Sequence, residues 1–78
     1  MQSRDVLAPW QGDPSLAWIQ LIRPGQRVID VGANIGTYTW LFAQRVGPRG
    51  VVHALEPGPK LFDRLRSEVS DLMNVRLY

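Results

Sequence analysis

The hydrophobic positions along the chain predict an alternation of helices and strands. Apolar residues spaced three and four apart, which is typical of one helix face, run through residues 16–22, 35–46 and 61–72. Short runs rich in valine, isoleucine and leucine, which are typical of buried strands, lie between them. The expected elements are helices at about 13–23, 37–46 and 59–73 and strands at 28–31, 51–55 and 75–78.

Capping and breaking residues set the expected ends of the helices. Asp13 can cap free amide groups and Pro14 is tolerated at a first helical position, so the pair predicts a helix start. Pro and Gly at 24–25 end that helix, and the Gly-Pro-Arg-Gly run at 47–50 ends the next one. We expect Asn74 to close the third helix.

Strands that alternate with helices predict an α/β fold with parallel strands joined by right-handed crossovers. The expected strand order is 3-2-1, which is a Rossmann-like half-domain and one half of a doubly wound sheet. We expect the strand at 28–31 to be covered on both faces and to have one free edge, which is a liability that complete proteins avoid. The sequence therefore predicts an N-terminal arm at 1–12 and, at 13–78, part of a larger domain that is truncated after its third strand or pairs through that edge.

Composition and charge narrow the classes of function. The 78 residues include no cysteine and a single histidine, His53, so disulfides, thiol nucleophiles and a multi-residue metal site are not expected. The net charge is +2 and the arginines are scattered, so no nucleic-acid partner is expected. No apolar run is long enough for a membrane span or a signal peptide, so we expect a cytoplasmic protein without membrane contact.

The turn after the first strand is a candidate ligand loop. Gly32 and Gly36 have no side chain, so a ligand can approach the backbone closely there and the turn can use positive φ. The helix that follows directs free amide groups at the same place, which favours a carboxylate or a phosphate. Asp30 supplies negative charge where an ammonium group could lie.

Glu56, at the end of the second strand, is the candidate partner of this loop. A carboxylate there can accept both hydroxyl hydrogens of a ribose. A dinucleotide fingerprint needs glycines where Asn34 and Thr37 stand, so a bulky pyrophosphate is disfavoured. An ammonium, a carboxylate and a ribose together describe S-adenosylmethionine, while a nicotinamide-dependent oxidoreductase remains an alternative.

The run V-I-D-V-G-A-N-I-G-T-Y-T at 28–39, followed by H-A-L-E-P at 53–57, strongly resembles the FkbM-type S-adenosylmethionine-dependent methyltransferases. The resemblance implies that the loop holds the methionine part of the cofactor and Glu56 its ribose, and that the acceptor is a small molecule or glycan oxygen. Gly58 stands where the family usually has Asn. The implied cofactor-binding residues are Asp30, Gly32, Ala33, Asn34, Gly36 and Glu56.

No residue of this chain is predicted to be catalytic, because positioning of the acceptor depends on parts of the family that have no counterpart here. His53 is a tempting general base, but it is expected to be a strand residue with one satisfied ring nitrogen. We therefore expect the 78-residue chain alone to be inactive. A further alternative is an inactive α/β module that folds against a partner.

Overall fold

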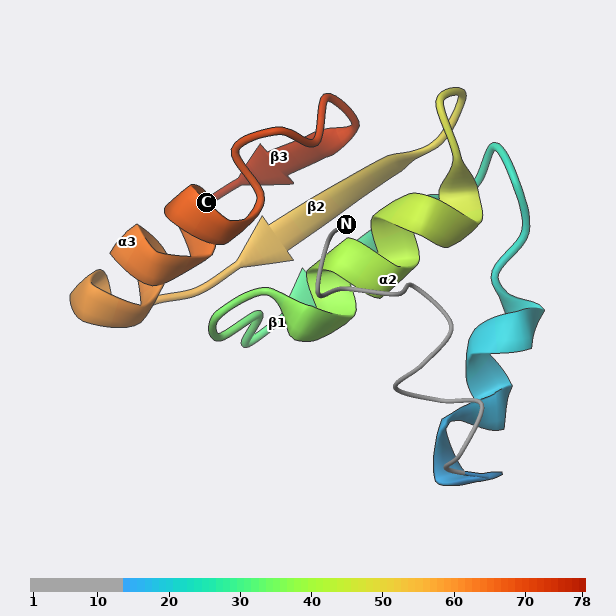
Figure 1. Cartoon of the computed structure of the whole chain (residues 1–78), viewed down its shortest axis with the longest axis horizontal. Coiled ribbons are helices and arrows are strands. Elements are labelled where there is room, and N and C mark those ends of the chain that lie inside the picture. The colour runs from blue at the N-terminus through green and yellow to red at the C-terminus, as the bar shows by residue number, and fades with distance from the viewer. Residues whose placement is uncertain (1–13) are drawn as a thin grey trace, which may run out of the picture.

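A computed structural model describes residues 14–78, so the predicted arm at 1–12 lies outside the described part. Within that part, helical segments and strands alternate as predicted (Figure 1). The elements are η1 (Pro14–Leu21), β1 (Arg27–Val31), α2 (Thr37–Val46), β2 (Val51–Leu55), α3 (Pro59–Glu68) and β3 (Val75–Leu77).

The three strands form one parallel sheet in the order β1-β2-β3. Ile29 lies opposite His53, and His53 lies opposite Arg76. Parallel pairing follows because a helix carries the chain back to the same end of the sheet before each new strand begins. The predicted Rossmann-like arrangement, with the second strand in the middle, is therefore confirmed.

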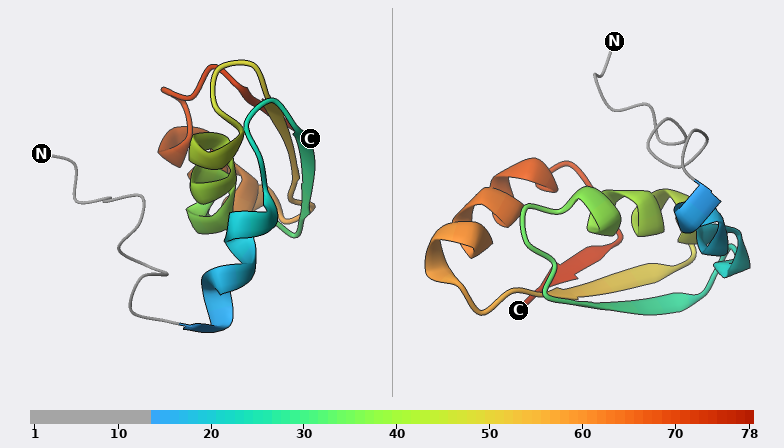
Figure 2. Two further views of the ribbon diagram at one scale, coloured as in Figure 1. Left: turned by 90° about the vertical axis from the view of Figure 1, so that its right-hand side faces the viewer. Right: turned by 90° about the horizontal axis from the view of Figure 1, so that it is seen from below.

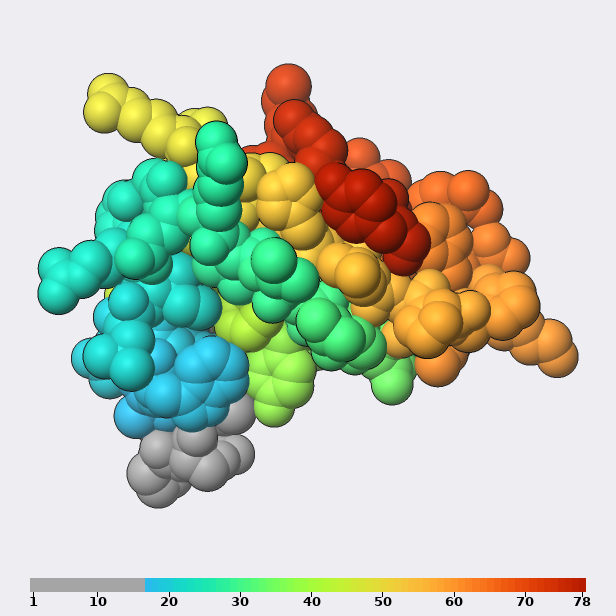
Figure 3. Space-filling model, turned by 180° about the vertical axis from the view of Figure 1, so that it is seen from behind, coloured from blue at the N-terminus to red at the C-terminus, as the bar shows by residue number. Residues whose placement is uncertain are grey.

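The helices α2 and α3 cover the same face of the sheet (Figure 2). On this face Val52 and Ala54 are fully buried, whereas on the opposite face Ile29 is 67% exposed and Val31 is 77% exposed. Figure 3 shows β1 and β2 at the surface of that opposite face, with no helix over them. The expectation that the first strand is covered on both faces is wrong for the described residues. Right-handed crossovers that add strands in one direction place both helices on one side.

Two clusters of buried side chains fill the layer between the helices and the sheet. Leu72 and Val75 pack against both clusters and so join them into one core. The cluster under η1 and α2 contains Ile19, Leu41, Phe42, Ala43, Val46 and Val52. The cluster under α3 contains Ala33, Ala54, Leu65 and Val69.

The first helical segment is a 3-10 helix rather than an α-helix. Ile22 N–H donates to the Ile19 carbonyl at 3.0 Å, which continues the i-to-i+3 bonding of η1. A 3-10 helix has three residues per turn, so positions three apart lie above one another. The spacing of three in the sequence therefore fits this geometry, with Ile19 fully buried and Ile22 packed against the first cluster.

The helix α3 ends at Glu68 and not near Met73 as predicted. Ser70 follows this end, and its hydroxyl donates to the Ser67 carbonyl at 3.1 Å. Serine side chains compete with helical backbone bonds in this way and favour turns. Leu72 continues the apolar spacing because it packs against the core from the turn.

Asn74 does not close α3, and the prediction for it is also wrong. Its Nδ2 donates to the carbonyls of Ala43 at 3.0 Å and Gly47 at 2.9 Å, at the end of α2. Amide side chains can bond the carbonyls that a helix end leaves free. Asn74 therefore joins the start of β3 to the end of α2. No helix within residues 14–78 has the length and apolar character needed to cross a membrane.

Candidate functional site

Two loops meet at the carboxyl edge of the sheet. Residues 32–36, called the first loop, follow β1, and residues 56–58, called the second loop, follow β2. The N–H groups of Gly32 and Ala33 donate to the Leu55 carbonyl at 2.8 and 2.9 Å. The first loop is thus held at the end of the second strand, which is the edge where open α/β sheets bind ligands.

Glu56 is the first residue of the second loop, and its carboxylate bonds to the backbone of both loops. Its Oε1 accepts from the Asn34 N–H at 2.8 Å, and its Oε2 accepts from the Gly58 N–H at 2.9 Å. The residue is only 9% exposed. Its carboxylate therefore has a fixed position beside the backbone bend at Asn34.

Asn34 and the two loop glycines have positive φ, but their surroundings differ. Asn34 has φ 58°, Gly32 has φ 72° and Gly36 has φ 96°. A Cβ on Gly32 would meet no atom within 4 Å, whereas a Cβ on Gly36 would lie 2.9 Å from Leu65 Cδ1. Gly32 therefore leaves open space beside the backbone, while Gly36 allows α3 to pack closely.

Asp30 lies beneath α2 rather than in the open loop. It is 9% exposed, and its Oδ2 accepts from the Thr39 hydroxyl at 2.6 Å. Burial raises the pKa of Asp30 above its ordinary value of 3.8, and the hydrogen bond from Thr39 opposes this rise. One carboxylate oxygen of Asp30 is thus already used to join β1 to the first turn of α2.

The start of α2 points its backbone amides toward the same edge. No side chain caps this end of the helix, and its first turn contains no acidic residue. The partial positive charge of a helix N-terminus attracts anions, and here the nearby carboxylate of Asp30 bonds to the Thr39 hydroxyl rather than to the free backbone amides. This arrangement suits a carboxylate group placed above the first loop.

The structure brings the predicted site residues into one region but gives them different neighbours. Gly32, Asn34 and Glu56 lie at the junction of the two loops. Ala33, which is 5% exposed, and Gly36 face the core instead. Their contribution to a ligand site is through the backbone shape that they allow.

The sequence reasoning missed the parts played by Thr39 and by the Gly58 backbone. Thr39 is fully buried and supplies the hydroxyl that Asp30 needs. A hydroxyl residue in the first turn of the helix after a strand acid is the signal that could have found it. In the sequence, Gly58 is only a departure from the family pattern, yet its N–H donates to the second carboxylate oxygen of Glu56 and holds it in place.

His53 lies on the open face of the sheet, where it is the neighbour of Ile29 on the adjacent strand β1. Its Nδ1 is 2.9 Å from the Tyr78 hydroxyl, and the centroids of the two rings are 5.7 Å apart. One ring nitrogen is therefore satisfied, as the sequence predicted for a strand residue.

A hollow of about 590 Å³ lies at the opposite edge of the sheet from the two loops. Gln44 on α2 and Asp71 and Asn74 before β3 are among the residues that line it. Ligands of open α/β sheets bind outside the carboxyl ends of the strands, and this hollow lies near their amino ends. It does not belong to the candidate site.

Comparison with known proteins finds methyltransferases among the sequence relatives. The 31-O-demethyl-FK506 methyltransferase FkbM of Streptomyces tacrolimicus is 52% identical over 46 residues, which are 59% of this chain and 17% of that protein. The ribosomal RNA large subunit methyltransferase E of Sorangium cellulosum is 44% identical over 41 residues, which are 53% of this chain and 19% of that protein. The chain thus spans about a fifth of the length of these curated relatives. No protein-family model matches it.

Solved structures with the same fold include methyltransferases. A SAM-dependent methyltransferase from Aquifex aeolicus matches with a TM-score of 0.74 and 26% identity, over 85% of this chain and 37% of that one. Aeropyrum pernix fibrillarin, solved with natively bound S-adenosyl-L-methionine, matches with a TM-score of 0.72 and 25% identity, over 82% of this chain and 31% of that one. The resemblance is confirmed: this chain is similar in sequence to an FkbM methyltransferase and has the fold of S-adenosylmethionine-dependent methyltransferases.

Proposed function

We propose that this chain is the cofactor-binding half of an S-adenosylmethionine-dependent methyltransferase that, when complete, methylates an oxygen of a small molecule or glycan. One observation carries the proposal. Glu56 Oε1 accepts from the Asn34 N–H at 2.8 Å, so the acid and the glycine-containing loop meet at the carboxyl edge of the sheet. The methyltransferases among the relatives and structural neighbours support the same cofactor.

The residues at this edge fit the chemistry of that cofactor. A carboxylate offers about four lone-pair positions, and the bonds from Asn34 and Gly58 use one on each oxygen of Glu56. One position on each oxygen is left, which matches the two neighbouring hydroxyls of a ribose. The open space beside Gly32 and the uncapped start of α2 suit the carboxylate end of the methionine part.

When bound, S-adenosylmethionine supplies a methyl group that is bonded to a positively charged sulfur. An acceptor oxygen can attack the carbon of this methyl group, and the sulfur then leaves as a neutral thioether. The residues of this chain hold and orient the cofactor for that reaction. Glu56 fixes the ribose, and the first loop with the start of α2 holds the amino-acid end. Correct positioning of the reacting atoms is the main contribution that such a site makes to the rate.

The choice of acceptor rests on the sequence relatives and on the charge pattern of this chain. The FkbM relative is named for a small molecule that lacks an O-methyl group, which supports an oxygen acceptor of that kind. The other relative is named for ribosomal RNA, so a nucleic-acid acceptor is the competing possibility. The scattered arginines of this chain favour the small molecule, because RNA binding draws on clustered positive charge.

A competition experiment tests the cofactor against the nicotinamide alternative. The 78-residue protein is labelled with a fluorescent probe and titrated with S-adenosylhomocysteine and with NADH, in either order. We expect S-adenosylhomocysteine to bind and NADH not to displace it at equal concentration. Preferential binding of NADH would overturn the proposal in favour of an oxidoreductase.

A second candidate is an inactive α/β module that folds against a partner. The observation that favours it is the open sheet face, on which Ile29 and Val31 are largely exposed. Gel filtration and hydrogen exchange of the isolated chain test this candidate. A stable monomer with protected strand amides would count against it.

A further inference from the structure

We infer that Glu56 is a positioning residue for the first loop, in addition to its proposed contact with the ribose. Its carboxylate holds the centre of that loop in shape before any cofactor arrives. The part of this inference that concerns ligand affinity rests on the proposed function. The part that concerns the loop of the ligand-free protein does not.

The geometry of the carboxylate is the first argument. Its two oxygens accept from two backbone groups that belong to different loops, Asn34 N–H at 2.8 Å and Gly58 N–H at 2.9 Å. A side chain that served the ribose alone would need no such bonds. Hydrogen bonds to an ionised acceptor are about twice as strong as neutral ones. The bond from the Asn34 N–H to the Glu56 carboxylate should therefore stabilise the short first loop more than a neutral bond would.

The backbone of Asn34 is the second argument. Its φ of 58° is in the left-handed region, which residues with a side chain rarely adopt and which asparagine adopts more readily than most of them. A conformation of this kind persists when surrounding contacts determine it. The bond from the Asn34 N–H to Glu56 is such a contact, and it reaches Asn34 from 22 residues away in the chain.

The remaining bonds of the first loop are the third argument. Its beginning is held by backbone alone, because the N–H groups of Gly32 and Ala33 donate to the Leu55 carbonyl. Its end is held by the N–H of Gly36, which donates to Ala33, and by close packing against α3. At Asn34, the backbone N–H donates to the side chain of Glu56, so loss of Glu56 should loosen the centre of the loop and leave both ends in place.

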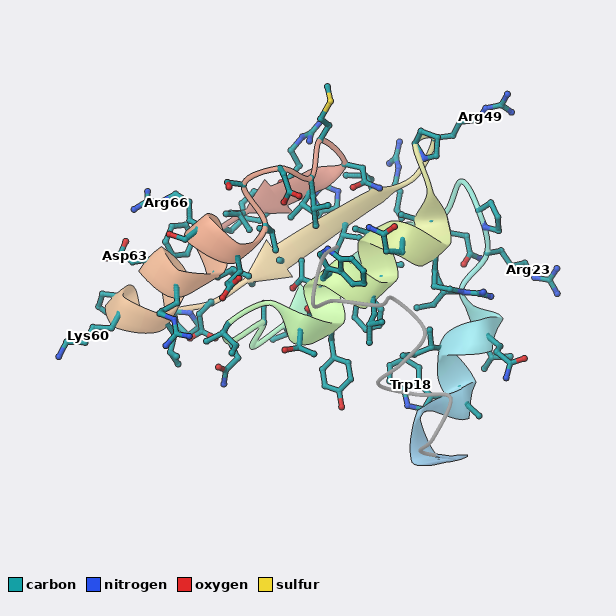
Figure 4. All side chains as sticks on the ribbon, in the orientation of Figure 1. Trp18, Arg23, Arg49, Lys60, Asp63 and Arg66 are labelled. Carbon is teal, nitrogen blue, oxygen red and sulfur yellow. The ribbon has the colours of Figure 1, made fainter. Side chains whose placement is uncertain are left out.

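Amide exchange in the ligand-free protein tests the loop directly. The variants are Glu56→Ala, which removes both acceptors, and Glu56→Gln, which keeps the side-chain volume and one acceptor oxygen. Asp63→Ala is the matched control, because it removes a carboxylate from the solvent side of α3, where Asp63 pairs with Arg66 at 2.7 Å (Figure 4). NMR gives the exchange rate of each amide.

We expect exchange at the Asn34 amide to become about tenfold faster or more in Glu56→Ala, with a smaller change in Glu56→Gln. Exchange at Gly32 and Ala33 should stay as in the wild type, as should every loop amide in Asp63→Ala. Unchanged exchange at Asn34 in both Glu56 variants overturns the inference. Equally faster exchange at all three loop amides overturns it as well, since this would mean general unfolding.

Ligand affinity separates the positioning role from the ribose contact. The probes are S-adenosylhomocysteine and its 2′,3′-dideoxy analogue, which lacks both ribose hydroxyls. We expect Glu56→Ala to weaken both probes, the first by about tenfold to a hundredfold and the second by a smaller factor. An unchanged affinity for the dideoxy analogue contradicts the positioning role while leaving the ribose contact intact. Equal affinity of the wild type for both probes contradicts the ribose contact, and the exchange data then decide the positioning role alone.

Discussion

At the scale of single residues, Gly32 and Gly36 look alike in the sequence but have different neighbours. Both have positive φ, at 72° and 96°, so each favours glycine for its backbone. Only Gly36 is also pressed against α3, where a Cβ would lie 2.9 Å from Leu65 Cδ1 and 3.1 Å from Val69 Cγ1. The structural role of Gly36 and the open surface at Gly32 can therefore be separated by mutation.

Alanine at these two positions should have unequal effects on stability. Both variants lose about 1 to 2 kcal/mol because alanine disfavours the left-handed region. Gly36→Ala should lose about 1 to 3 kcal/mol more, because the added methyl group overpacks the contact with Leu65. Urea denaturation of the two variants measures the difference, and equal losses would contradict the packing role.

The raised pKa of Asp30 predicts a pH dependence of stability. Asp30 binds its proton more tightly in the folded than in the unfolded chain, since burial raises its pKa above 3.8. Its contribution to folding is therefore greatest at low pH and declines as the pH rises from 3.8 through the raised pKa. Asp30→Asn stays uncharged and keeps an oxygen that can accept from Thr39, so it should lack this decline.

Urea denaturation of both proteins between about pH 3 and pH 7 checks the prediction. The variant should gain stability relative to the wild type as the pH rises through this range. A relative stability that stays constant, or that falls with pH, would mean that burial does not control the proton affinity of Asp30.

The meeting of Glu56 with the first loop could be predicted from the sequence, because the carboxyl ends of neighbouring parallel strands share one edge. The bond from the Asn34 N–H could not be predicted, because it depends on the positive φ of a residue other than glycine. Asp30 was expected beside a ligand ammonium. Its hydroxyl partner, Thr39, comes from the helix packed above β1, and residue type alone does not reveal such packing.

At the scale of elements, the helix and strand pattern was predictable where apolar spacing and breakers agree. The helix α2 begins and ends where expected because Gly36 and Gly47 flank it. The end of α3 could not be predicted from the spacing of apolar residues. Leu72 continues that spacing and packs against the core, although it lies in the turn after the helix. The role of Asn74 could not be predicted either, because its side chain bonds to the end of α2, which is distant from it in the sequence.

Removal of the Asn74 amide tests this link between elements. Asn74→Ala loses two hydrogen bonds to the end of α2, so we expect a loss of about 1 to 3 kcal/mol in the free energy of unfolding. Ser70→Ala is the control, because its exposed hydroxyl bonds only locally to Ser67, and it should change stability by less than about 0.5 kcal/mol. Equal effects in the two variants would show that Asn74 does not hold α2.

At the scale of the whole molecule, the sheet has one covered and one open face. Short, almost wholly apolar runs predicted that the strands are buried, but such runs do not reveal whether one or two layers of helices cover the sheet. Ile29 and Val31 read as core in the sequence and lie at the surface in the described structure.

Substitutions on the two faces should differ accordingly. Ile29→Thr keeps a β-branched residue on the open face and should change the free energy of unfolding by less than about 0.5 kcal/mol. Leu65→Ala opens a cavity beneath α3, where Leu65 is fully buried, and should cost about 2 to 5 kcal/mol. If Ile29→Thr costs as much as Leu65→Ala, the open face is covered in solution.

The most direct test of the cofactor site is an NMR titration of the ¹⁵N-labelled chain with S-adenosylhomocysteine. The account predicts that the largest shifts occur at the amides of Gly32, Asn34 and Gly58, where the two loops meet Glu56. Amides of Gln44 and Asp71, in the hollow at the opposite edge, should not move. Shifts concentrated in that hollow, with the two loops unaffected, would contradict the account.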